Sequence, residues 1–193
     1  MGSRTVIVAH GDADVQHVLR AAPVLDRPGT LELVGTVFPE MQLDEVGDAL
    51  LLDSLDPPDG AVYAGCFPDL DLLCTRLLVG ERPSETVKRY PRPHHRPNTY
   101  LLVLDSDTSW CAFGMLREGE LVRSLSVTPE RVYENIGDPL PFELPFCEGE
   151  REPDPLALGE EALHAFFGFR LQGMDSVDDV DPEVIPLVGY RIS

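Results

Sequence analysis

The chain has 193 residues, with 34 acidic and 15 basic side chains and a formal net charge of −19. Its length fits one domain, and shares of 43% hydrophobic and 25% charged residues are typical of a globular protein rather than a disordered one. No apolar run approaches the ~18–20 residues that span a bilayer, and the acidic excess disfavours nucleic acid as a partner, because phosphate binding relies on Lys and Arg.

Short elements are expected along the whole chain, because 18 prolines interrupt the sequence. Residues Thr5–Ala9 predict a buried strand, and an Asp in the following turn is placed to cap a helix over Val15–Ala22. Residues Thr30–Phe38 fit a helix or a strand, and we favour the helix. The later predictions are a short element over Ala49–Leu55, strands over Ala61–Phe67 and Leu70–Cys74, and a helix from Pro83 to about Tyr90.

Three strand-like runs give the clearest signal in the sequence. They cover Thr99–Leu104, Ser109–Leu116 and Glu120–Val127. Gly119 lies between the last two runs and predicts a tight hairpin turn. Both faces of the middle run are largely apolar, which predicts a central strand covered on both sides.

The last third of the chain begins with a proline-rich segment, 138–155, for which no regular structure is expected. Residues Leu158–Leu171 predict an amphipathic helix that ends at Gly173, and Leu187–Ile192 predict a final strand. Together the elements predict a single α+β domain over residues 1–193. Its sheet is expected to be mostly antiparallel or mixed, with a few short helices packed on it.

The four cysteines are expected to be reduced thiols with a structural role. They contain no C-x-x-C pair, and the N-terminus lacks a signal-peptide pattern, which together predict a cytoplasmic protein. Cys66 follows a glycine, as a nucleophile does in a strand-turn-helix elbow, but without an identified His partner it is better interpreted as a strand residue. Phosphate-binding glycine loops and serine-nucleophile motifs are absent, so the sequence implies no cofactor.

Basic residues concentrate between positions 76 and 96, where six bases and two acids give a local balance of +4 and leave −23 for the rest. One interpretation is that this basic segment pairs with acids of the same protein. The other is a phosphate- or carboxylate-binding patch, because Arg side chains suit such anions. The candidate anion-binding residues are Arg82, Arg89, Arg92 and Arg96.

Polar side chains follow two of the predicted strands, Thr5–Ala9 and Thr99–Leu104. If these strands were parallel neighbours, their ends would meet at one edge of the sheet, where oxygen ligands could hold Mg²⁺ or Mn²⁺ or a small ligand. The alternative is that both segments are ordinary turns, in which Asp bonds to nearby backbone. The candidate ligand-binding residues are His10, Asp12 and Asp14 after the first strand, and Asp105 and Asp107 after the second.

Several segments, in a fairly specific order over nearly the full length, are similar to a known family. They are the opening strand with His10-Gly11-Asp12, PPDGAVYAGCFPDLDLLC, GELVRSLSVTP with IGDPLPFE, and the closing helix with DVDPEVIPLVGYRI. The chain resembles an uncharacterised actinobacterial protein family, a domain of unknown function. The resemblance implies a stand-alone cytosolic protein and agrees with a helix at Thr30–Phe38. It implies no activity, cofactor or site residue.

The leading functional hypothesis is a non-enzymatic interaction protein, regulatory or immunity-like, that binds a basic protein partner through its acidic surface. The first alternative is a metal-dependent enzyme or small-ligand binder that uses the strand-end carboxylates. The second is anion recognition by the arginines. The sequence carries no signal of oligomeric state.

Overall fold

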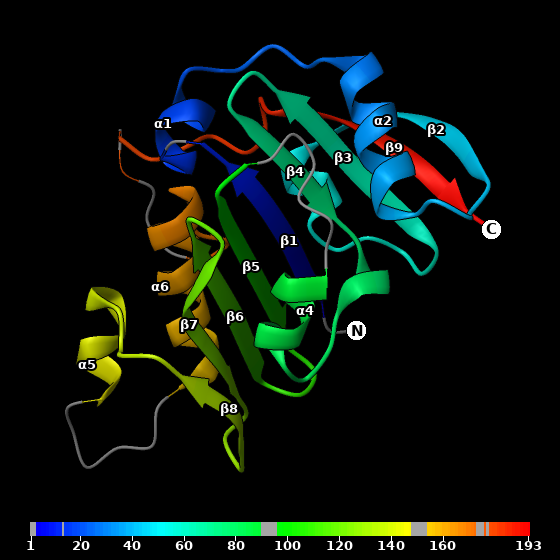
Figure 1. Ribbon diagram of the computed structural model, residues 1–193. Helices are drawn as coiled ribbons and strands as arrows, with labels where there is room; N and C mark the ends of the chain where they lie inside the picture. The colour runs from blue at the N-terminus through cyan, green and yellow to red at the C-terminus, as the bar shows by residue number, and fades with distance from the viewer. Residues whose placement is uncertain (1–2, 13, 90–95, 148–153, 173–175, 177) are drawn as a thin grey trace.

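The computed structural model describes residues 3–12, 14–89, 96–147, 154–172, 176 and 178–193. In this part of the chain nine strands form one antiparallel sheet, with short helices on both faces (Figure 1). The predicted single α+β domain is confirmed, and of the two kinds of sheet expected, the antiparallel one is found. The strands are β1 (Arg4–Gly11), β2 (Leu43–Leu50), β3 (Ala61–Phe67), β4 (Leu70–Cys74), β5 (Asn98–Asp105), β6 (Trp110–Arg117), β7 (Glu120–Val127), β8 (Val132–Ile136) and β9 (Pro186–Ile192).

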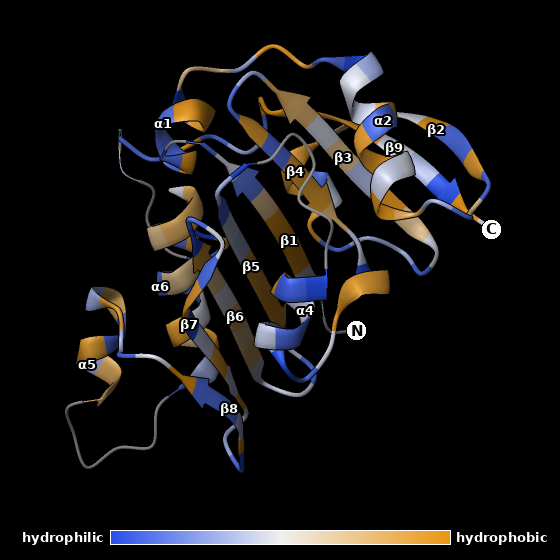
Figure 2. Ribbon diagram, in the orientation of Figure 1, coloured by the Kyte–Doolittle hydropathy of each residue, from blue (hydrophilic) through white to orange (hydrophobic). Residues whose placement is uncertain are grey.

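The strand order is β2-β9-β3-β4-β1-β5-β6-β7-β8, so β2 and β8 form the two edges of the sheet. The last strand, β9, lies between β2 and β3 and pairs antiparallel with both. The first strand, β1, lies at the centre and pairs antiparallel with β4 and β5. Figure 2 shows hydrophobic residues along the central strands and hydrophilic residues over much of both edges.

The helices are α1 (Val15–Arg20), α2 (Arg27–Val37), α3 (Leu51–Ser54), α4 (Pro83–Arg89), α5 (Leu144–Cys147) and α6 (Pro155–Phe167), with 3-10 turns η1 (Arg76–Leu78) and η3 (Pro141–Glu143). One face of the sheet, the α6 face, carries α6 over β5 and β6, with α1 packed beside α6. The opposite face, the α2 face, carries α2 against β3 and α4 against β6 and β7. Within the described residues, no helix is both long and apolar enough to cross a membrane.

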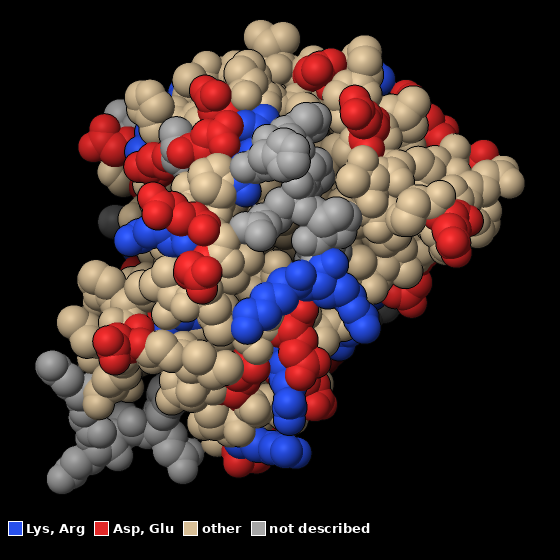
Figure 3. All heavy atoms as spheres, in the orientation of Figure 1, with Lys and Arg blue, Asp and Glu red and all other residues tan. Residues whose placement is uncertain are grey.

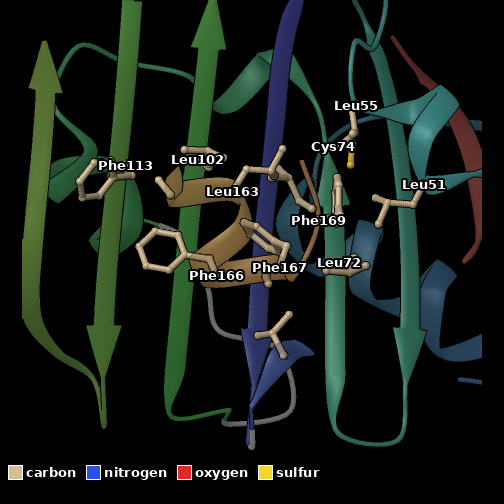
Figure 4. Packing of buried hydrophobic residues seen from close by; sticks show 14 of the residues in the cluster. Leu51, Leu55, Leu72, Cys74, Leu102, Phe113, Leu163, Phe166, Phe167 and Phe169 are labelled. Atoms are coloured by element: carbon tan, nitrogen blue, oxygen red, sulfur yellow. The ribbon is translucent and has the colours of Figure 1, made fainter. Parts of the chain in front are cut away.

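Each face of the sheet has its own hydrophobic core, because successive side chains of a strand point to opposite faces. In β1, Ile7 and Ala9 belong to the cluster under α6, whereas Val6 and Val8 belong to the cluster under α2. Figure 4 shows the first cluster, in which phenylalanines of α6 and the segment after it point at leucines of the sheet. Phe166 also packs on Phe113 of β6, with ring centroids 5.9 Å apart.

The helix α6 begins and ends three to four residues earlier than the sequence predicts. Asp154 accepts hydrogen bonds from the backbone N–H groups of Leu156 and Ala157, and Pro155 takes the first helical position, where its missing N–H costs nothing. Gly168 ends the helix in a left-handed conformation, φ 84°. The predicted stop at Gly173 lies outside the described residues.

Other differences concern polar or proline-rich segments. The predicted element Ala49–Leu55 is the end of β2 followed by α3, and β8 was not predicted. Within segment 138–155, residues Pro141–Cys147 form η3 and α5, and residues 148–153 lie outside the described part. The buried side chain of Glu143 binds Arg123 of β7, at 2.6 Å between Oε2 and Nη2, and so fastens this segment to the sheet.

Candidate functional site

The two acidic turns that the metal hypothesis combines lie at opposite ends of the sheet. That hypothesis needs β1 and β5 to be parallel, but they are antiparallel, with Arg4 opposite Asp105 and Gly11 opposite Asn98. Seven residue steps separate these two pairs, which is about 23 Å of extended strand. The structure therefore does not bring Asp12 and Asp105 together.

Asp105 stabilises its own turn instead. Its carboxylate accepts a hydrogen bond from Arg4 Nε at 2.8 Å and others from the backbone N–H groups of Asp107 and Thr108. Burial by itself would raise the pKa of Asp105, but the Arg4 guanidinium and these N–H donors outweigh it, so the pKa lies below its ordinary value. Asp107 itself is exposed. This end of the sheet corresponds to the alternative interpretation, an ordinary Asp-stabilised turn.

At the other end, His10 lies in a row of buried polar side chains that runs across four strands on the α2 face. The register places Asp71 of β4 opposite both Cys66 of β3 and His10 of β1, and places His10 opposite Thr99 of β5. His10 Nδ1 and Thr99 Oγ1 are 3.0 Å apart. We call Cys66, Asp71, His10 and Thr99 the buried polar row.

Arg96 connects the buried polar row to the surface. Its guanidinium donates to Asp71 Oδ2 at 2.8 Å, to Asp12 Oδ2 at 2.7 Å and to the backbone carbonyls of Phe67 and Pro68. Asp12 and Arg96, which the sequence places in two different hypotheses, are thus partners of each other. Asp14 is not part of this group, because its side chain caps α1 by accepting from the N–H of Gln16.

The environment of the buried polar row determines the protonation state of the Cys66 thiol. Burial and a hydrogen bond to the Asp71 carboxylate raise the pKa of Cys66 to about 12, so the thiol stays protonated at neutral pH and is a poor nucleophile. A surface hollow of ≈ 560 Å³ adjoins Cys66 and Arg96. The guanidinium beside it already binds two carboxylates and two carbonyls, which leaves it poorly placed to recognise an added anion.

The remaining arginines of the anion hypothesis do not join Arg96. Arg82 and Arg89 are exposed and line a separate hollow of ≈ 370 Å³ between η1 and α4, and Arg82 Nη1 lies 3.2 Å from Glu85 Oε1. Arg92 lies outside the described residues. In the described part of the chain, no group of three or more His, Cys, Asp or Glu side chains is arranged to hold a metal ion.

Buried charges come in pairs. The acids that are buried within the described residues are Asp71, Asp105 and Glu143, and each contacts one arginine: Arg96, Arg4 and Arg123, respectively. Because these pairs are neutral as units, the excess of negative charge belongs to exposed and half-buried side chains. In Figure 3 acidic side chains spread over the surface shown, whereas Lys and Arg gather around α4.

The edge strand β2 is one place where acids gather. Asp44, Glu45 and Asp48 are all exposed. Arg27 of α2 contacts two of them, Glu45 at 3.2 Å and Asp48. A second base, the exposed Arg191 of β9, lies opposite Asp44 in the strand register. Three acids against these two arginines leave this edge with one net negative charge.

Sequence reasoning missed Asp71, Thr99 and Cys66 as members of one cluster, although one signal was present. Asp71 stands alone in the apolar run Leu70–Cys74, and a carboxylate in a buried strand needs a partner inside the protein. That signal predicts a buried arginine or a similar donor, but it does not indicate which one.

Comparison with known proteins gives a family but no activity. A family model described as a family of unknown function (DUF6928) matches residues 5–190. No curated protein and no solved structure matches the chain.

Proposed function

The chain belongs to the family of unknown function DUF6928, and on that premise we propose that it is a non-enzymatic interaction module, regulatory or immunity-like, that binds a basic protein partner through its acidic surface. The observation that carries the proposal is the pairing of each described buried acid with an arginine. The excess of negative charge, −19 in total, therefore lies on side chains that a partner can reach. A charge of this size steers encounter with a basic partner and discriminates against acidic ones.

Two further features support a binding role over a catalytic one. Burial, together with a hydrogen bond to Asp71, raises the pKa of Cys66 and keeps the thiol protonated, and Arg96 is engaged by groups of the same protein. The four cysteines are free thiols, three of them buried, which supports placing the module in the cytoplasm.

Affinity purification at two ionic strengths tests this function. The immobilised chain should retain a specific basic protein at about 50 mM salt and release most of it at about 500 mM, because screening shortens the reach of charge attraction to a few ångströms. A matched acidic protein of similar size, immobilised at the same density, controls for nonspecific retention. Recovery of no specific partner at either ionic strength would contradict the proposal.

A further inference from the structure

The edge strand β2 presents unpaired backbone groups. It pairs with β9 on one side, and among the described residues no strand pairs with its other side. Gln42 and Ser193 exchange both backbone hydrogen bonds, at 3.0 and 3.2 Å. By the alternation of an antiparallel ladder, Leu43 and Glu45 therefore direct their N–H and C=O groups away from β9. An exposed row of this kind is a template for another strand.

Two apolar side chains on the same strand are unusually open to solvent. Val46 is 54% exposed and Leu50 is 38% exposed. Val46 is the extra residue of a bulge, because Glu45 pairs with Tyr190 and Gly47 with Gly189, which leaves Val46 without a partner on β9. The edge thus offers hydrogen-bonding groups, apolar contact area and negative charge within eight residues.

The charge decides which kind of strand fits. A second copy of this chain that paired through β2 would bring Asp44, Glu45 and Asp48 against the same acids, and like charges directly across a strand pair are destabilising. Glu45 and Asp48 lie opposite Tyr190 and Val188, whose side chains belong to the cluster under α2. A strand with Lys or Arg at alternate positions would meet both of these acids on that face. The other edge, β8, also exposes two apolar side chains, Val132 and Ile136, but it lacks the negative charge, because its one acid, Glu134, is turned inward to Ser84 and Ser124.

We propose that β2 is the docking strand of the module and that it binds an extended, basic segment of a protein partner by adding that segment to the sheet. This inference rests on the proposed function and specifies its surface. Backbone hydrogen bonds to β2 supply affinity, and the acids select a basic sequence.

The test uses a defined probe, a fluorescent ten-residue peptide of alternating Lys and Val with blocked ends. Its control is the same peptide with alternate backbone nitrogens methylated, which keeps the charge but removes the hydrogen-bond donors. At low salt, methylation should weaken binding to the full chain about tenfold or more, as measured by fluorescence anisotropy. Hydrogen exchange of the unmodified protein should show new protection at Leu43–Leu50 when the peptide is bound.

Matched variants separate edge binding from general charge attraction. The edge variant Asp44→Asn, Glu45→Gln, Asp48→Asn should lose about tenfold in affinity. The control variant Glu118→Gln, Glu120→Gln, Glu130→Gln makes the same change in net charge at exposed positions on the far side of the sheet order, and it should lose less than about threefold.

Each other outcome has a distinct meaning. Three results would overturn strand addition while leaving the proposal of an acidic interaction module intact. They are equal binding of the methylated and unmethylated peptides, equal losses of affinity in the two variants, and hydrogen-exchange protection confined to segments other than β2. Absence of binding by either peptide at low salt, together with no basic partner in the affinity purification, would overturn both proposals.

Discussion

At the scale of single residues, Arg96 shows how a basic side chain can be used within an acidic protein. It is 4% exposed, and its guanidinium binds two carboxylates and two backbone carbonyls. Asp71, one of these partners, is fully buried. A buried ion pair adds little net stability over an apolar pair of similar volume. Loss of one member is costly, however, because the other charge stays buried away from water without its counter-charge.

Replacement of Arg96 tests this directly. Arg96→Met removes the guanidinium from Asp71 and Asp12, and we expect it to lower the free energy of unfolding by about 3–5 kcal/mol. Arg82→Met is the control, because Arg82 and Glu85 form an exposed pair worth about 0–1 kcal/mol. Urea unfolding measures both. Similar small losses in the two variants would show that the interior tolerates the Asp71 carboxylate without its arginine.

The residues of this region were only partly predictable. The turn after the first strand marks His10 and Asp12 as polar groups at a strand end, and the arginine-rich segment marks Arg96. Their contact was not predictable, because it depends on how strands far apart in sequence pair. Because β1 and β5 are antiparallel, Asp105 lies at the opposite end of the sheet from Asp12. Neither strand's sequence by itself indicates whether the two strands run parallel or antiparallel.

At the scale of elements, α6 approaches the sheet closely because it carries a glycine at the contact. A Cβ at Gly159 would lie 1.9 Å from Leu104 Cδ2 and 3.3 Å from Cys111 Sγ. In α2, by contrast, a Cβ at Gly35 would have no neighbour within 4 Å. The two positions therefore separate helix propensity from packing.

Two alanine substitutions should change stability in opposite directions. Gly35→Ala should raise the free energy of unfolding by about 0.5–1 kcal/mol, the usual gain in helix propensity. Gly159→Ala should lower it by about 1–3 kcal/mol, because Leu104 must leave its packed position. Thermal and urea unfolding provide the measurement. A gain in stability from Gly159→Ala would mean that α6 can move away from β5 at little cost.

Elements with strong local signals were predicted well. The hairpin of β6 and β7 follows from alternating apolar residues and Gly119. The spacing at Thr30–Phe38 fits a helix or a strand, and the favoured helix is the one found, as α2. The strand β2 was missed over most of its length because Leu43–Leu50 contains three acids and a glycine, which are depleted in strands. An edge strand tolerates them, since one side of it faces solvent.

At the scale of the whole molecule, the outward charge opposes compactness. Repulsion among exposed carboxylates destabilises the folded state, and salt screens this repulsion. Added NaCl should therefore stabilise the protein by on the order of 1 kcal/mol, or about 2–4 °C in Tm. Differential scanning calorimetry at neutral pH measures the effect. The same salt titration near the pI of about 4.4 is the control, and there the increase in Tm should disappear. A Tm that falls with added salt at neutral pH would show that local ion pairs outweigh the general repulsion.

The position of β9 affects the order in which the sheet can be completed during synthesis. Strands β3, β4, β1, β5, β6, β7 and β8 are neighbours of one another and precede residue 137. β2 is made early, but its partner in the sheet is β9, which follows all the other described strands in the sequence. A nascent chain can thus pair these seven strands before β9 has been synthesised. During that time β2 stays unpaired, and its acidic side chains keep it hydrated. When residues 186–192 leave the ribosome, they pair with both β2 and β3 and so add β2 to the sheet.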